Sequence, residues 1–132
     1  MFAVAVYFNE APDRKKQKHY QAWQVINTAQ GKGGSGGRIE AMQELNADKI
    51  ALVALSADDA LLHSVKLPKA NLSRSNFEAS DLRDCVLEGA HIELATLVFA
   101  CFRGCNLQGV HFTDSNLRRS HGDANKVHFR HR

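Results

Sequence analysis

Large apolar residues recur at every fifth position through the second half of the chain. From Leu62 onward, twelve consecutive positions in this phase hold Leu, Ile or Phe, and the residue two places before each is small or a valine. The other three positions of each five are mostly polar. The twelve large residues are Leu62, Leu67, Leu72, Phe77, Leu82, Leu87, Ile92, Leu97, Phe102, Leu107, Phe112 and Leu117.

A strict period of five excludes the two common regular elements. An amphipathic helix repeats its apolar positions about every 3.6 residues, and a half-buried strand about every 2. A period of five requires a backbone that turns once per repeat and directs each large residue to a common axis. Such a path is a solenoid, in which each repeat contacts its neighbours and a continuous core runs along the inside. We therefore expect the twelve large residues to point inward.

Several segments resemble the A(D/N)LXX motif of the pentapeptide-repeat family. Residues 70–74 read ANLSR, residues 80–84 read SDLRD and residues 105–109 read CNLQG. The resemblance implies the fold of that family, an all-β solenoid in the form of a right-handed quadrilateral β-helix with four pentapeptides per coil. For this chain it implies three to four coils, stacked at about the strand spacing of 4.7–4.9 Å.

The repeats also predict the boundaries of the solenoid. We expect it to span residues 50–129, with a regular core at 60–119 and a basic tail at 130–132. The part before residue 60 is expected to be irregular because Ala57 is a small residue at a core position. Residues 120–132 are expected to fray. The three full coils are then 60–79, 80–99 and 100–119.

Residues 1–49 follow a helical pattern instead. Tyr20, Trp23 and Ile26 share one face of a helix expected from about residue 14 to residue 30. A glycine-rich linker at 31–37 ends that helix.

A second short helix is expected from about Arg38 to Leu45, with Asn46 available to end it. A solenoid exposes an apolar end and unpaired backbone groups, so we expect the two helices to cap the first coil, with Trp23 as an anchor. A segment that folds only with a partner is the alternative.

The stretch from Arg14 to Asn27 resembles a segment that follows transmembrane helices in some bacterial membrane-associated pentapeptide-repeat proteins. The resemblance implies that Phe2–Phe8 is the remnant of a span and that the basic run after it is its cytoplasmic flank. By itself the apolar run is far shorter than the roughly 20 residues of a spanning helix. We expect a cytoplasmic protein, or one tethered at the cytoplasmic face of a membrane if a transmembrane segment precedes Met1.

The charge of the chain argues against one function known in the family. The net charge is +3, and residues 60–119 hold seven Lys and Arg against six Asp and Glu. A DNA-mimicking, topoisomerase-protecting protein of the quinolone-resistance type needs an acidic rod in place of phosphates. That alternative is therefore disfavoured, and protection of gyrase in a supercoiling assay would test it. No nucleic-acid partner is expected; a nucleic-acid binder usually concentrates its Lys and Arg on one face, and a mild net charge by itself does not indicate such a partner.

Few residues suggest chemistry. The three cysteines are an odd number without a CxxC pair, which indicates free thiols in a reducing compartment. Cys85 and Cys105 occupy small inward positions of adjacent coils, and Cys101 points outward without a neighbouring base. Gly31, Gly33 and Gly36 match GxGxxG, but a helix rather than a strand precedes them, so they indicate a linker. We expect no enzyme and no cofactor.

Two outward-facing sets remain as candidate sites. His91 and His111 should lie one strand spacing apart and are weak candidates for zinc or copper ligands, because no third ligand is evident; a solvated polar ladder is the alternative. Leu94, Val98 and Phe99 are apolar at outward positions and predict an interaction patch, unless the tail or an N-terminal helix covers them. We therefore expect a non-enzymatic interaction or scaffold module that binds an unknown protein partner or a second copy of itself.

Overall fold

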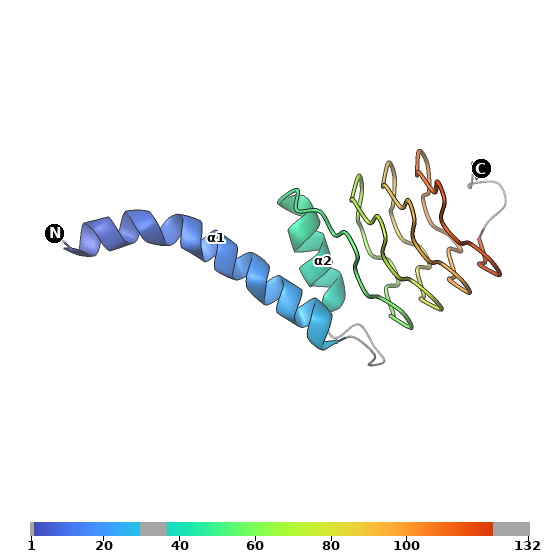
Figure 1. The fold of residues 1–132 in the computed structure, drawn as a ribbon, viewed down its shortest axis with the longest axis horizontal. Helices are drawn as coiled ribbons and strands as arrows, with labels where there is room; N and C mark the ends of the chain where they lie inside the picture. Colours follow the sequence, from blue (N-terminus) through green and yellow to red (C-terminus); the bar gives the residue numbers. More distant parts are fainter. Residues whose placement is uncertain (1, 30–36, 123–132) are drawn as a thin grey trace.

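The computed structural model describes residues 2–29 and 37–122, with residues 2–13 described by their backbone alone. The elements are α1 (Phe2–Thr28) and α2 (Arg38–Ala47), followed by a series of turns up to residue 122. Figure 1 shows α2 beside the first of several stacked levels, while the N-terminal half of α1 extends away from them. Neither helix contains an apolar stretch that would suffice to cross a lipid bilayer.

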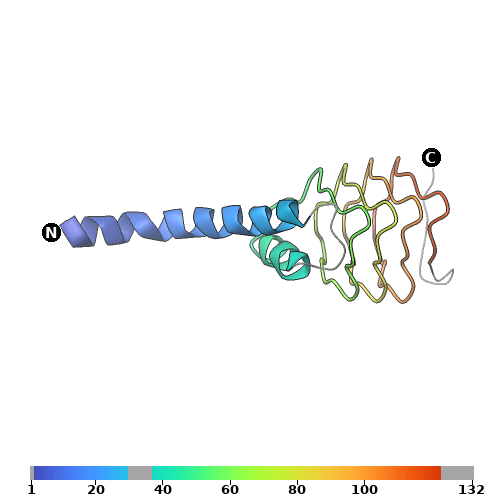
Figure 2. The ribbon, with the colours of Figure 1, turned by 90° about the horizontal axis from the view of Figure 1, so that it is seen from below.

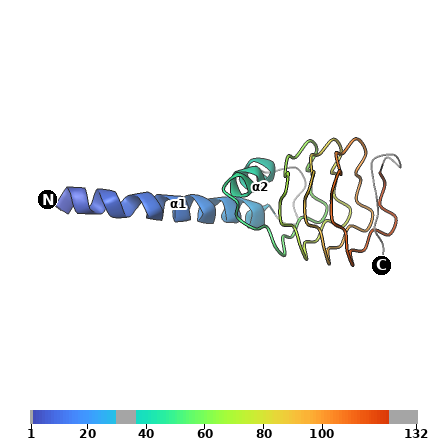
Figure 3. The same ribbon diagram turned by 90° about the horizontal axis from the view of Figure 1, so that it is seen from above.

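The chain after α2 turns at every fifth residue and passes over its own path again after twenty. Parallel bridges join residues 20 apart, from Ser56 and Asn76 at one end to Cys101 and His121 at the other. The stacked levels are visible from two sides in Figures 2 and 3. Each bridge joins a single pair of residues. The described part of the repeats is therefore paired in parallel but contains no strand of ordinary length.

Every turn between Ala54 and Arg119 has a positive φ at its third residue. The N–H of Ala60 donates to the carbonyl of Ala57 at 3.3 Å, and Asp59 between them has a φ of 55°. A positive φ at the second central residue is typical of a type II turn. The conformation recurs at every fifth residue, and Gly occupies only three of these positions. Each other residue there costs roughly 1–2 kcal/mol, which the backbone hydrogen bonds between levels offset.

The Asn or Asp before a core residue supports the next turn. Oδ1 of Asn76 accepts a hydrogen bond from the N–H of Glu78 at 3.0 Å, and Oδ1 of Asp81 accepts one from Arg83 at 3.1 Å. An Asn or Asp side chain that binds the backbone two residues later mimics a backbone turn. This is the physical reason for Asn and Asp at the second position of the repeat.

The large residues fill the interior of the stack. Eleven of the twelve are at most 5% exposed, and Leu117 is partly buried against them. Serine at the small inward position also finds partners, since Oγ of Ser75 accepts from the N–H of Leu55 at 3.1 Å and donates to the carbonyl of Leu52 at 3.2 Å. The buried hydroxyl of Ser75 therefore has hydrogen-bond partners that offset its loss of contact with water.

The first level is regular, contrary to the expectation from Ala57. Leu52 and Leu55 are buried with Ala57, and the turns at Ala54 and Asp59 keep the period of five. A small core residue is tolerated here because its large neighbours fill the interior. The predicted fraying of 120–132 and the basic tail at 130–132 lie outside the described residues, except that His121 still bridges to Cys101.

Helix α2 covers the open edge of the first level. Met42 and Leu45 are fully buried in the same core as the repeats. Oε1 of Gln43 accepts a hydrogen bond from the N–H of Lys66 at 2.8 Å, and Nδ2 of Asn46 donates to the carbonyl of Pro68 at 3.0 Å. These side chains satisfy backbone groups that a further coil would otherwise bind. The helix continues to Ala47, so Asn46 does not end it.

Helix α1 packs on α2 with its last turns. Ala22 and Ile26 are buried, and Trp23 is partly buried against the core. Tyr20 is 64% exposed, so its predicted place on the buried face is wrong. The helix also begins at Phe2, well before the predicted start near residue 14.

An ion cluster joins the two helices and predicts a pH dependence. Nε2 of His19 lies 2.8 Å from Oδ2 of Asp48, and Nζ of Lys18 lies 3.3 Å from Oε1 of Glu44. The hydrogen bond from His19, followed by the charge of Lys18, lowers the pKa of Asp48 below its usual 3.8, against the opposing effect of partial burial. A carboxylate whose pKa is lowered in the folded protein stabilises the fold at pH values above its usual pKa. This stabilisation is lost as the pH falls through the lowered pKa.

We expect the wild type to be more stable than the Asp48→Asn variant at pH 6. The difference should shrink towards zero as the pH falls below 3.8. Urea unfolding of both proteins between pH 6 and pH 2 measures this. A difference that stays constant, or grows on acidification, would contradict the role of the Asp48 carboxylate.

Two glycines at turn positions give a matched pair of substitutions. A Cβ added to Gly104 (φ 74°) would lie 2.1 Å from Oδ1 of Asp84, whereas one added to Gly109 (φ 71°) would meet only Gly89, at 3.8 Å. Both Gly→Ala variants should lose about 1 kcal/mol because of the left-handed backbone. Only Gly104→Ala should also displace Asp84 from His63 and so move the imidazole NMR signals of His63. Equal signals in both variants would contradict this contact.

Candidate interaction surface

Two open hollows lie on the outside of the part of the chain that the structure describes. One open hollow of about 490 Å³ lies between the end of α2 and the first level, where Lys49, Ile50 and Lys69 line it. A second open hollow of about 220 Å³ lies on the wall near the last described level. The interior itself is filled by the core residues.

The predicted patch is divided between two turns. Val98 and Phe99 line the smaller hollow together with Asn116, Arg118 and Arg119. Phe99 is 48% exposed. Leu94 is also about half exposed, but it lies at the preceding turn, one repeat earlier, and does not line this hollow. The patch is therefore centred on Phe99.

Two arginines extend the patch, and the sequence analysis missed them. The guanidinium of Arg119 lies 5.6 Å from the centroid of the Phe99 ring, which is a cation–π contact. The N–H of Phe99 donates to the carbonyl of Arg118 at 3.1 Å, so the two turns are stacked. The period of twenty carried this signal, because Arg118 and Arg119 follow Val98 and Phe99 by twenty residues. The patch thus combines apolar area with positive charge.

His91 and His111 are stacked on adjacent levels. Their ring centroids are 4.8 Å apart and their planes differ by 4°. Nδ1 of His91 lies 3.2 Å from Oε1 of Glu93. Among the residues that the structure describes, no three His, Cys, Asp or Glu side chains are grouped so that they could hold a metal ion. The geometry matches a polar ladder on the wall, and metal binding here stays a prediction.

The interpretation of Cys85 and Cys105 as free thiols is corrected by the structure. The two residues stack on adjacent levels and are joined by a disulfide, with their Cα atoms 4.6 Å apart. Parallel levels bring equivalent positions this close, and that separation lies within the range that a disulfide can bridge. Cys101 is free and partly exposed, at an outward position as expected.

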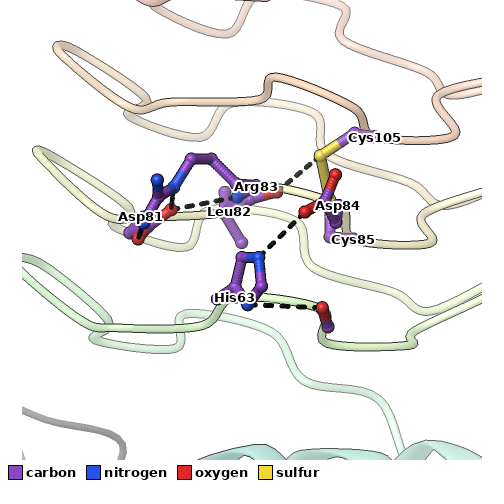
Figure 4. Close-up of polar contacts among 8 residues, drawn as sticks. His63, Asp81, Leu82, Arg83, Asp84, Cys85 and Cys105 are labelled. Carbon is purple, nitrogen blue, oxygen red and sulfur yellow. Dashed lines mark hydrogen bonds and ion pairs between the residues drawn. A yellow bond between two sulfur atoms is a disulfide. The ribbon is translucent and has the colours of Figure 1, made fainter.

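A cluster of polar side chains lies beside the Cys85–Cys105 disulfide (Figure 4). Nε2 of His63 lies 2.9 Å from Oδ2 of Asp84, and Nδ1 lies 3.4 Å from the hydroxyl of Ser64. Arg83 donates to both carboxylate oxygens of Asp81, at 2.9 and 2.8 Å, and these bonds lower the pKa of Asp81. His63 and Asp84 are more than half exposed, and none of these residues lines either hollow. The cluster therefore resembles surface pairing more than a site for nucleophilic catalysis.

The burial of Arg38 was also not predicted from the sequence. Its side chain is fully buried at the start of α2. Burial lowers the pKa of Arg38, and the negative charge of Asp58 acts in the opposite direction. A charged residue at the start of a helix gives no sign in the sequence that it is buried.

Comparison of the sequence with protein families gives one match. Residues 58–93, 70–109 and 100–121 match the family described as Pentapeptide repeats, in eight copies. No curated protein matches the sequence.

Solved structures similar to this chain include two cyanobacterial proteins and one plant protein. Rfr23 of Cyanothece 51142 is 25% identical, with a TM-score of 0.30 over 60% of this chain and 54% of its own. HetL of Nostoc sp. PCC 7120, described as involved in heterocyst differentiation regulation, is 15% identical, with a TM-score of 0.33 over 55% of this chain and 57% of its own.

A pentapeptide repeat protein of the Arabidopsis thaliana thylakoid lumen is 21% identical, with a TM-score of 0.28 over 61% of this chain and 68% of its own. The chain thus spans little more than half the length of the two cyanobacterial proteins. The family match covers the stacked turns themselves and is independent of these structures. Residues 58–121 of this chain thus consist of repeats that match the pentapeptide-repeat family.

Proposed function

We propose that this pentapeptide-repeat protein is a non-enzymatic binding module and that its repeats form a right-handed quadrilateral β-helix. The four turns per twenty residues and the parallel bridges between levels support this architecture. The filled interior and the open hollows support binding through the walls, because a catalytic site needs a pocket that excludes water.

One observation carries the choice of surface. Phe99 is half exposed on a wall whose core phenylalanines, such as Phe77 and Phe102, are at most 2% exposed. An exposed aromatic ring with an arginine over it is typical of the centre of a protein interface, where aromatic residues and Arg are enriched. The partner is therefore a protein that binds at Phe99. The same wall carries Arg118 and Arg119, which is unfavourable for a mimic of DNA phosphates.

Photo-crosslinking tests this function. A photoreactive phenylalanine analogue at position 99, in cells that express the protein, should give a covalent adduct with a protein. The same analogue at Gln108, an exposed turn position outside the patch, is the matched control and should give none. Equal labelling at both positions, or no adduct at position 99, contradicts a binding surface at Phe99.

A further inference from the structure

One corner of the stack changes its charge from level to level. We call it the graded ridge; it consists of Asp58-Asp59, Glu78-Ala79, Val98-Phe99 and Arg118-Arg119. These pairs occupy the same turn on four successive levels, since the N–H of Asp59 donates to Glu78, that of Ala79 to Val98 and that of Phe99 to Arg118, at 2.8, 2.8 and 3.1 Å. The ridge therefore carries three acidic residues on the two levels next to α2, is apolar on the third level and is basic on the fourth.

The outer residues of the graded ridge are complementary, in charge and in size, to the same residues of a second copy that runs in the opposite direction. Along the stack they read Asp59, Ala79, Phe99 and Arg119, and all four are exposed. If a second copy runs in the opposite direction, each Asp59 faces an Arg119 and each Phe99 faces an Ala79. The small Ala79 leaves room for the large ring. A copy in the same direction would instead place Asp59 on Asp59 and Arg119 on Arg119.

A second corner with four described levels lacks this property. Its outer residues read Ala54, Arg74, Leu94 and Asp114. In reverse order Ala54 would face Asp114, and Arg74 would face Leu94, so no pair of opposite charges forms. Self-complementarity thus distinguishes the graded ridge from this second corner and does not follow from the repeat itself.

We propose that two copies of this chain pair antiparallel along the graded ridge, about a two-fold axis between the second and third levels. This rests on the proposed function and names its partner. Such an interface is isologous, so each contact occurs twice. The four levels extend over only about 15 Å at the usual strand spacing. The pairing is therefore weak, with a Kd of about micromolar or above, as for interfaces below about 1,200 Å².

Charge reversal tests the pairing by sedimentation equilibrium at low ionic strength. Asp59→Arg gives the outer position at both ends of the ridge a positive charge, and Arg119→Asp gives the outer position at both ends a negative charge. Each variant alone should dimerise at least about 30-fold more weakly than the wild type, because two ion pairs become repulsive. An equimolar mixture of the two should regain dimers, since the basic ridge then faces the acidic one. The double variant Asp59→Arg/Arg119→Asp should also dimerise.

The outcomes separate this proposal from the proposed function. A wild type that stays monomeric up to about 1 mM, the weak limit of useful affinity, overturns the pairing, and so does a dimer that charge reversal leaves unchanged. If the photoreactive residue at position 99 then captures a different protein, the binding function stands while self-pairing fails. Unchanged thermal unfolding of each variant shows that loss of the dimer is not loss of the fold. Dimers of the wild type and of the double variant, together with their loss in each single variant, establish the antiparallel arrangement, because in a parallel pair like charges would face each other in all four proteins.

Discussion

Replacing Phe77 by alanine is expected to lower the free energy of unfolding by about 3–5 kcal/mol. The side chain is 1% exposed and belongs to the continuous core that runs from α2 through the repeats. Its removal leaves a cavity that the neighbouring levels cannot close, because hydrogen bonds such as Phe77 N–H to Thr96 O (2.7 Å) fix their spacing. Urea unfolding at a protein concentration well below the proposed dimerisation range measures the loss.

The matched control for Phe77→Ala is Phe99→Ala. Both changes remove the same atoms, but Phe99 is half exposed at a turn and leaves no cavity. Its loss should cost no more than about 1 kcal/mol, mainly from the contact with Arg119. Similar losses for the two variants would mean that the fifth-residue positions do not form the core.

The second large effect is expected from the disulfide. Replacing Cys85 and Cys105 together by alanine should lower the free energy of unfolding by about 3 kcal/mol. The cross-link closes a loop of one level, with a sequence separation of 20, and so restricts the unfolded chain. Reducing agent should lower the stability of the wild type by a similar amount and leave the double variant unchanged.

Cys101→Ala is the control for the disulfide, because this cysteine is free. Its stability should stay within about 0.5 kcal/mol of the wild type. Thiol titration of the unfolded, unreduced protein should find one reactive group. Three reactive groups, with no effect of reducing agent on stability, would show that the two cysteines are thiols. A thiol at Cys105 would then donate to the carbonyl of Leu82, which lies 2.5 Å from its Sγ.

Much of the repeat architecture could be predicted because each core residue follows a local rule. One turn per five residues determines which side chain points inward, and a level of twenty residues determines which residues stack. The stacking of His91 on His111 follows from this arithmetic alone. The same arithmetic places Arg119 on the level next to Phe99, in the same column of the outer wall.

Other features do not follow from a period. Helix α1 begins at Phe2 and continues through Pro12, although proline lacks the N–H that a helix interior uses and so favours a start after it. The burial of Arg38 depends on how α2 sits on the first level. The bond between Cys85 and Cys105 depends on the oxidation state of two stacked sulfurs, which their spacing cannot specify. Composition suggested a reducing compartment and hence thiols.

The constant turn conformation makes the length of an insertion decide its effect. Twenty additional residues would add one level and leave all columns in register. Five additional residues would keep every large side chain inward but move all later residues by a quarter of the circuit. A five-residue deletion between Phe99 and Arg119 would thus preserve the core while it carries the guanidinium to another wall. Evolution can therefore rearrange the surface of such a protein in steps of one repeat without redesigning its interior.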